Sequence, residues 1–308
     1  TRRARWAKRS PMPAFWLPNP PADEQLRAPG GPRTPAGAEA RMEALTELLL
    51  PLLGPNDKLF HGRPASDEER ARGSWVGRAW MMTPRAIDTF KNMGIRPIKS
   101  PSMEVLRRVN SRKFAATLGI DLPGAAFVSN MDQLTDRLQD APIGPHWLLR
   151  RPHGFSGRGR QRVDQGEMKP AAFAWSANAF REEGGLEIVP YVKPVKEAAI
   201  HGFIAEDGTV TLGEPTVQVV DAKGQWVESR RAEPGDLEDA ECESLKTTAQ
   251  STADALRKAG YFGPFGIDGM RWRTGEHRGF APRIDVNARY TMGWAIGMGD
   301  RRPDLAVE

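Results

Sequence analysis

The sequence predicts an α+β protein, in which helices and β-strands alternate along most of the chain. Five segments have the apolar spacing or the end signals of helices: 38–53, 102–118, 130–139, 170–183 and 236–259. Short runs of branched and aromatic residues between and after them are typical of strands: 125–128, 146–150, 187–192, 201–205, 216–220, 265–273 and 283–287. These two observations are the basis of the fold-class prediction.

The composition is that of an ordinary globular protein. The 308 residues are 39% apolar and 27% charged, and they are enough for a sizeable core. No apolar run reaches the ~18 residues of a membrane-spanning helix, and the basic N-terminus lacks the apolar stretch of a secretory signal. Cys242, between Glu241 and Glu243, is the one cysteine, so we expect no internal disulfide, a cytoplasmic location and no catalytic thiol.

The net charge of +5 arises at the N-terminus. Without the five basic residues among the first ten, the 44 basic residues fall to 39 and equal the 39 acidic ones. Such a basic arm can contact nucleic acid or anionic lipid, or it can be a solvated tail. Because it lacks interleaved aromatic residues on a basic face, a nucleic-acid partner is not expected.

The first hundred residues carry shorter structural signals. The proline-rich stretch 11–37 predicts extended chain or loop, with one short strand at 14–17. A second short strand is expected at 58–60. Thr83 and Pro84 predict the start of a helix, because threonine caps helices and proline suits their first position.

The helix predicted at 102–118 is expected to be continuous. Ser102 is its expected N-cap, and Gly119 is expected to end it. Two tight turns between strands are expected, at Asp207-Gly208 and at Thr274-Gly275.

A basic, glycine-rich segment follows the strand predicted at 146–150. Glycine lets backbone N–H groups approach phosphate oxygens closely, and arginine supplies paired donors. The segment lacks the glycine patterns of P-loops and of Rossmann folds, and a hairpin turn on a basic edge is the alternative interpretation. Its candidate phosphate-binding residues are Arg150, Gly154, Phe155, Ser156, Gly157, Arg158 and Gly159.

Three polar side chains interrupt the last two predicted strands. Asp285 and Asn287 are two residues apart, so both point to one face of the sheet, and Asp268 lies on the other strand. Oxygen ligands of this kind suit Mg²⁺, which also takes phosphate oxygens and water. Arg289 follows directly, where a transferred phosphate can meet it. Ordinary hairpin polarity is the alternative.

The strand predicted at 187–192 ends in a turn restricted by Pro190. Backbone groups at such a turn can bind an adenine edge, and a carboxylate a few residues later, such as Glu197, can accept from ribose hydroxyls. A plain strand and turn is the alternative.

In this order, the motifs resemble those of the ATP-grasp superfamily. The resemblance implies phosphate binding by Lys113, with Arg150 at the position of a second lysine. It also implies nucleotide contacts at an adenine hinge, a metal set, and arginines that stabilise the transferring phosphate. The implied residues are Glu187, Val189, Tyr191, Val192 and Glu197 for the nucleoside, Asp268, Asp285 and Asn287 for the metal, and Arg150, Arg158 and Arg289 for catalysis.

The resemblance also implies a domain organisation and a reaction. We expect a basic N-terminal segment and small α/β pre-ATP-grasp domain at 1–101, followed by two α+β subdomains at 102–186 and 187–308 that clasp ATP. With ATP and Mg²⁺, or Mn²⁺, the enzyme would activate a small-molecule or peptide carboxylate as an acyl phosphate for an amine acceptor. A homodimer is a further expectation.

Three other functions remain open on the sequence alone. A kinase of the same fold would phosphorylate a hydroxyl and stop there. A nucleotide-binding module would keep the fold without turnover, in line with Arg150, Val189 and Asp285 at positions where the superfamily usually has other residues. A nucleic-acid binder would use the basic arm.

Overall fold

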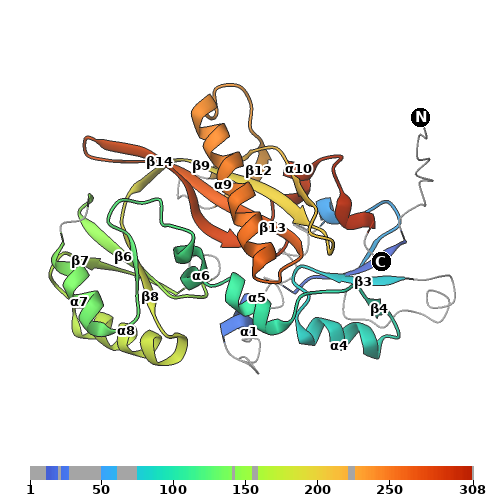
Figure 1. Cartoon of the computed structure of the whole chain (residues 1–308), viewed down its shortest axis with the longest axis horizontal. Coiled ribbons are helices and arrows are strands. Elements are labelled where there is room, and N and C mark those ends of the chain that lie inside the picture. Colours follow the sequence, from blue (N-terminus) through green and yellow to red (C-terminus); the bar gives the residue numbers. More distant parts are fainter. Residues whose placement is uncertain are drawn as a thin grey trace.

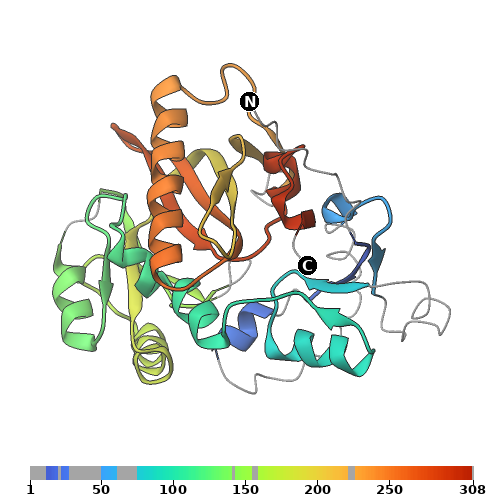
Figure 2. The same cartoon turned by 45° about the vertical axis from the view of Figure 1, so that its right-hand side comes forward.

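The computed structural model describes residues 12–19, 22–27, 50–60, 75–140, 143–154, 159–220 and 226–306 (Figure 1). Within these residues the strands form three sheets, here called the N-terminal, small and large sheets. In both views the large sheet stands between the other two (Figures 1 and 2). The mixed α+β architecture agrees with the prediction.

The N-terminal sheet has the strand order β2-β1-β3-β4, and its paired strands are parallel. As predicted, the Thr83 side chain caps α4 by accepting from the Ala86 N–H, and Pro84 is its first residue. Phe90 of α4 packs on Gly77 of the sheet. The elements are β1 (Ala14–Leu17), β2 (Lys58–Leu59), β3 (Val76–Ala79), α4 (Pro84–Asn92) and β4 (Arg96–Pro97).

The proline-rich stretch contains a helix that the sequence did not predict. Within 11–37, predicted to be extended or loop, α1 spans Ala22–Arg27. The prolines of this stretch lie before Ala22 and after Arg27, so none of them interrupts the helix. The helix predicted at 38–53 lies mostly outside the described residues, and its last part forms the short 3₁₀ turn η1 (Leu50–Leu52).

The helix predicted at 102–118 is two helices, α5 (Met103–Val109) and α6 (Arg112–Thr117). The Ser102 hydroxyl caps α5 as predicted, but the Ser111 hydroxyl caps a second start by accepting from the Lys113 N–H at 3.2 Å. Between them, the Asn110 side chain accepts from the Ala288 N–H at 2.8 Å. This long-range bond accompanies the break in the helix.

The small sheet has the antiparallel order β5-β8-β6-β7, and two helices pack against it. Its core contains Trp147, Leu149 and Ile188, with Leu134 and Ala179 from the helices. The sequence did not predict β7. The elements are β5 (Ala126–Val128), α7 (Met131–Gln139), β6 (His146–Arg150), β7 (Arg160–Asp164), α8 (Pro170–Glu183) and β8 (Leu186–Pro190).

The large sheet has the order β12-β11-β9-β13-β14, with β10 paired to β9. One face packs against α9, which lies lengthwise along it and buries Leu245, Ala249 and Ala253 (Figure 2). The chain ends in α10 (Trp294–Met298) and η2 (Pro303–Ala306). The elements are β9 (Lys193–Ile204), β10 (Val210–Leu212), β11 (Thr216–Val220), β12 (Trp226–Arg231), α9 (Asp239–Lys258), β13 (Gly263–Thr274) and β14 (His277–Asn287).

The predicted boundary at 101/102 falls just before α5, and that at 186/187 falls at the start of β8, which pairs within the small sheet. The chain enters the large sheet with β9. Among the described residues, no helix has both the length and the apolar character needed to cross a bilayer.

Packing between α4 and its sheet predicts the effect of one methyl group. A Cβ atom at Gly77 would lie 2.4 Å from the Phe90 Cγ atom, so Gly77→Ala should lower the free energy of unfolding by about 1–3 kcal/mol, as in other overpacked cores. Urea unfolding measures this change. Combined with Phe90→Leu, the loss should be smaller than the sum of the two single losses. Additive losses would contradict the contact.

Candidate functional site

A cavity of about 380 Å³ lies over the face of the large sheet opposite α9, and we call it the charged cavity. It draws residues from all three parts of the molecule: Trp80 after β3, Arg150 from β6 and the strands of the large sheet. Its charged lining residues are four arginines and two aspartates, and this excess of positive charge favours an anionic ligand. They are Arg112, Arg150, Arg160, Arg289, Asp268 and Asp285.

The sheet brings the three predicted metal ligands together. Asp268 of β13 is paired directly with Asp285 of β14, and Asn287 lies two residues further along. The Asn287 side-chain amide donates to Asp268 Oδ2 at 2.9 Å. All three line the charged cavity. Strand alternation places Ile267 and Val286 in the core beneath α9, so the polar and apolar faces follow the period of the strands.

The two carboxyl groups differ in acidity. Enclosure among protein atoms raises the pKa of Asp268 to about 7, and the negative charge of Asp285 raises it further. The hydrogen bond from the Asn287 amide acts in the opposite direction and lowers it. Enclosure would also raise the pKa of Asp285, but the charges of Arg112 and Arg150 outweigh it, and this pKa is lowered. A divalent cation between the two would relieve the repulsion that raises the Asp268 pKa.

These residues fit Mg²⁺ or Mn²⁺ as a partial ligand set. Among the described residues, no group of three or more His, Cys, Asp or Glu side chains is gathered for a metal. The candidate set is therefore two carboxylates and one amide oxygen. Such a set suits Mg²⁺, which binds through one or two carboxylates and takes other ligands from phosphates and water.

Two arginines on the small-sheet side of the cavity bond to β14, the strand that carries Asp285. Arg150 donates from Nε to Glu187 Oε2 at 2.5 Å and from Nη2 to the Ile284 carbonyl at 2.8 Å. Arg112 donates from Nη2 to Asp285 Oδ2 at 2.7 Å. Arg112 was not among the site residues predicted from the sequence. The break before α6 turns it inward, whereas Lys113, the predicted phosphate ligand, is exposed and lies outside the cavity lining.

The glycine-rich loop has well-anchored ends. The Arg151 N–H donates to the Gly159 carbonyl at 2.8 Å, and Gly154 and Gly159 both line the charged cavity. Phe155, Ser156, Gly157 and Arg158 lie outside the described residues, so their predicted phosphate contacts stay predictions.

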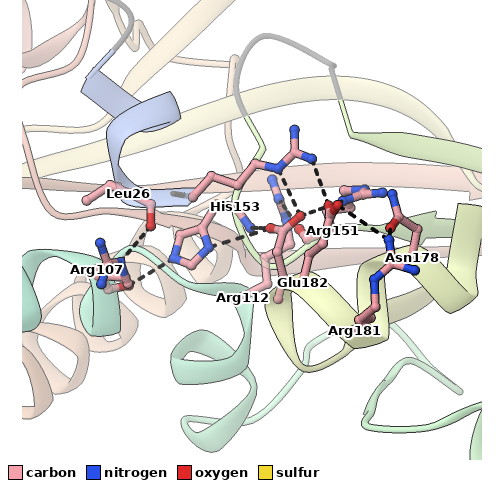
Figure 3. Close-up of polar contacts among 10 residues, drawn as sticks. Leu26, Arg107, Arg112, Arg151, His153, Asn178, Arg181 and Glu182 are labelled. Carbon is pink, nitrogen blue, oxygen red and sulfur yellow. Dashed lines mark hydrogen bonds and ion pairs between the residues drawn. The ribbon is translucent and has the colours of Figure 1, made fainter. Parts of the chain in front are cut away.

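A charge network anchors the base of this loop, as Figure 3 shows. Arg151 Nη1 donates to Glu182 Oε2 at 3.1 Å and to Glu183 Oε1 at 2.7 Å on α8. His153 Nε2 lies 3.0 Å from the Arg107 carbonyl oxygen of α5. The start of the loop is therefore held by α8 and α5.

The predicted adenine hinge lies beside the cavity. Val189 and Val192 are buried, Glu187 is buried and paired with Arg150, and the Tyr191 N–H donates to the His146 carbonyl at 2.9 Å. Glu187 and Val189 line a recess of only about 10 Å³, about the volume of one water and too small for a purine. A bound base would require the two sheets to separate here.

Glu197 lies on β9, near enough to Asp268 for their charges to interact. Enclosure raises its pKa, and the charge of Arg160 opposes this rise. Its negative charge also contributes to the raised pKa of Asp268. Its predicted contact with ribose stays a prediction.

Arg289 is buried at the edge of the cavity and is held from a distant part of the chain. Its Nε donates to Asp23 Oδ1 of α1 at 3.1 Å, and its guanidinium lies 5.8 Å from the centre of the Trp80 ring. Asp23 was not among the predicted site residues, because α1 itself was not predicted.

His201 is a second site residue that the sequence analysis did not assign. Its ring lines the cavity between the Thr216 and Thr291 hydroxyls, at 3.2 and 3.1 Å. Burial lowers its pKa to about 3, so the ring is neutral. Cβ atoms on Gly293 and Gly297 would lie 2.8 and 2.6 Å from this ring, so glycine is needed around it.

Solved structures resemble the chain along nearly all of its length, whereas no family model and no curated protein matches its sequence. Biotin carboxylase from Campylobacter jejuni, in a β-γ-ATP complex, has a TM-score of 0.58 at 14% identity, covering 93% of this chain and 67% of that chain. D-alanyl-alanine synthetase A from Vibrio cholerae has a TM-score of 0.54 at 13% identity, covering 95% and 93%.

An N5-carboxyaminoimidazole ribonucleotide synthetase in complex with ADP has a TM-score of 0.52 at 11% identity, covering 94% of this chain and 77% of that chain. These three proteins are all ATP-grasp enzymes. At such low identities the likeness concerns the fold, and it agrees with the order of motifs in the sequence. The chain adopts the ATP-grasp fold.

Proposed function

We propose that the protein is an ATP-dependent ligase that joins a carboxylate to an amine. The observation that carries this proposal is the charged cavity, where Asp268, Asp285 and Asn287 lie with Arg150 and Arg289. Both described ends of the glycine-rich loop line the same cavity. Oxygen ligands, guanidinium groups and a glycine-rich loop around one space are the parts that phosphoryl transfer requires.

Each group has a role in the proposed reaction. Asp268, Asp285 and Asn287 hold the divalent cation, which when bound neutralises phosphate charge. Arg150 and Arg289 donate to phosphate oxygens and stabilise the charge that develops on them. The substrate carboxylate attacks the γ-phosphate of ATP to give an acyl phosphate and ADP, and the amine then displaces phosphate to give an amide.

Arg112 has a role in this proposal because it is paired with the proposed metal ligand Asp285. The Arg112–Asp285 ion pair is 2.7 Å long, so a cation bound to Asp285 competes with Arg112 for the same carboxylate. Arg112 would then be available to phosphate oxygens, in the role that the sequence predicted for Lys113. Little acid–base chemistry by side chains is needed, in line with a neutral His201.

The substrates are a small-molecule or peptide carboxylate and an amine. The structurally similar ATP-grasp enzymes are carboxylate–amine ligases, and this supports the class of reaction. The solved structure in complex with ADP supports ADP as the nucleotide product.

One observation favours a second candidate, a nucleotide-binding module with weak turnover. Arg150, Val189 and Asp285 stand at positions where the superfamily usually has other residues, and Arg150 and Asp285 line the charged cavity. Release of ADP and phosphate from MgATP, measured with pooled carboxylic acids and amines, separates the candidates. Phosphate release that depends on an amine supports the ligase, a phosphorylated product supports a kinase, and nucleotide binding without release supports the module.

Removal of one proposed metal ligand should abolish turnover. Asp285→Ala should lower ATP hydrolysis by about a hundredfold or more, since it removes a carboxylate from the cation without removing core packing. A coupled ADP assay measures this, and circular dichroism checks the fold. Glu276→Ala, at an exposed turn on the same hairpin, is the matched control and should keep full activity. Wild-type turnover in Asp285→Ala would refute the metal assignment.

A lysine at position 150 should retain part of the activity. Arg150→Lys keeps the charge but replaces two donor nitrogens in a fixed geometry, which bond Glu187 and the Ile284 carbonyl, by a single one. We expect turnover within about tenfold of wild type and a higher KM for ATP, whereas Arg150→Met should lose most turnover. Steady-state kinetics distinguish these outcomes. Complete inactivity of Arg150→Lys would show that position 150 does not act through its charge.

Metal affinity should rise with pH. Enclosure raises the pKa of Asp268 to about 7, and the charge of Asp285 contributes to this rise. Asp268 is therefore neutral below that pH and ionised above it. Because the cation requires the ionised form, Mn²⁺ affinity should increase by up to about tenfold per pH unit below pH 7 and level off above it. Water-proton relaxation measures the affinity. Asp268→Asn should remove this dependence, and a flat wild-type profile from pH 6 to 8 would contradict the assignment.

A further inference from the structure

A second cavity, of about 220 Å³, lies between the N-terminal sheet and one end of the large sheet, and we call it the apolar recess. Residues that follow β3 form one wall, and the end of β9 and the turn before β13 form the other. Most of its lining is apolar, including Met81, Leu106, Phe203, Ile204 and Phe262.

The apolar recess adjoins the charged cavity. Trp80 and Arg289 line both spaces, and the Arg289 guanidinium lies 5.8 Å from the centre of the Trp80 ring. Arg289 follows Asn287 of the proposed metal set by two residues. A ligand in the recess therefore has one end at the wall shared with the charged cavity.

Trp80, which lines both spaces, also carries a buried polar atom. Its side chain is 94% buried, and its indole Nε1–H has no hydrogen-bond partner among the described residues. Indole nitrogen is only a donor, and buried donors are almost always paired. A turn of the ring that brings this N–H to the recess would let an acceptor oxygen on a bound molecule satisfy it.

Size and charge restrict the chemistry of that molecule. At about 220 Å³ the recess exceeds the ~150 Å³ cavity that accommodates benzene, and it is below the ~300 Å³ at which sites for drug-sized ligands begin. It therefore suits one ring or a branched chain. Its charged lining residues are Arg78, Lys99, Arg289 and Glu206, an excess of positive charge, and Lys99 and Glu206 pair at 2.9 Å.

We propose that the apolar recess binds the body of the carboxylate substrate, a small carboxylic acid with a ring or branched chain. Its carboxylate lies at Trp80 and Arg289 and faces the charged cavity, where the acyl phosphate would form. This assignment rests on the proposed ligase function for its chemistry, but ligand binding to the recess can be measured without turnover.

The first experiment measures binding of 3-phenylpropanoate to the full chain by isothermal titration calorimetry. It should bind at least about tenfold more tightly than propanoate, which lacks the ring, and than 3-phenylpropan-1-ol, which lacks the charge. Trp80→Phe keeps an aromatic ring but removes the N–H donor. It should weaken the binding of 3-phenylpropanoate by about tenfold and the binding of the alcohol by less, because a charged acceptor makes the stronger hydrogen bond. Equal affinities for the three probes would overturn the proposal.

A filled recess provides the second experiment. Ala205 lines the recess, so the larger side chain of Ala205→Leu should fill part of it. The same change at the exposed Ala174 of α8 is the matched control. The control should bind 3-phenylpropanoate as wild type does, and Ala205→Leu should reduce it to the affinity of propanoate. Unchanged binding in Ala205→Leu would overturn the proposal.

MgATP binding to the same samples separates this inference from the ligase proposal. Binding of MgATP without any preference for 3-phenylpropanoate refutes the recess as a substrate site and leaves the ligase proposal intact. The full pattern of probe and variant effects without MgATP binding supports the recess as a carboxylate site and refutes the ligase.

Discussion

Two aspartates on neighbouring strands, enclosed on the floor of one cavity, are the constraint on which the rest of the site depends. Register pairs Asp268 with Asp285, and α9 fills the opposite face of the sheet, so the two charges cannot turn away into the core. Each ionised carboxylate raises the pKa of the other unless a positive charge compensates it. Arg112 and Arg150 provide it for Asp285 from the small-sheet side, so the electrostatics of the large sheet are completed by another part of the molecule.

The contact between the small and large sheets also has an apolar part. Val189 of the small sheet packs with Met270 and Ile284 of the large sheet, beside the Arg150 bonds that cross between the sheets. A nucleotide base that entered here would exchange these contacts for its own, so binding and relative movement of the two sheets would be coupled. The arginines keep a role after such movement, because phosphate oxygens can replace the carboxylates as acceptors.

Local signals in the sequence predicted the features that depend on local physics. Strand alternation placed Asp285 and Asn287 on one face, and the capping residues Thr83 and Ser102 marked true helix starts. The missed features depend on contacts between distant residues. Asn110 bonds to Ala288, 178 positions away, where the helix is interrupted and Arg112 rather than Lys113 turns inward. Asp23 and Arg289 are 266 positions apart, and no spacing rule connects them.

The short helix α1 forms ion pairs of unequal burial with β14's end and with α8, and this difference bears on movement. Asp23 and Arg289 form an ion pair with side chains only 10% and 9% exposed, and breaking such a pair costs about 3–5 kcal/mol because a charge is left buried. Arg27 pairs on α8 with the exposed Glu182 at 3.4 Å and with the buried Glu183 at 3.0 Å, but its own side chain is 46% exposed, so solvent screens both pairs. The contact of α1 with α8 is therefore easier to break than the Asp23–Arg289 pair, which keeps Arg289 in place at the end of the proposed metal set.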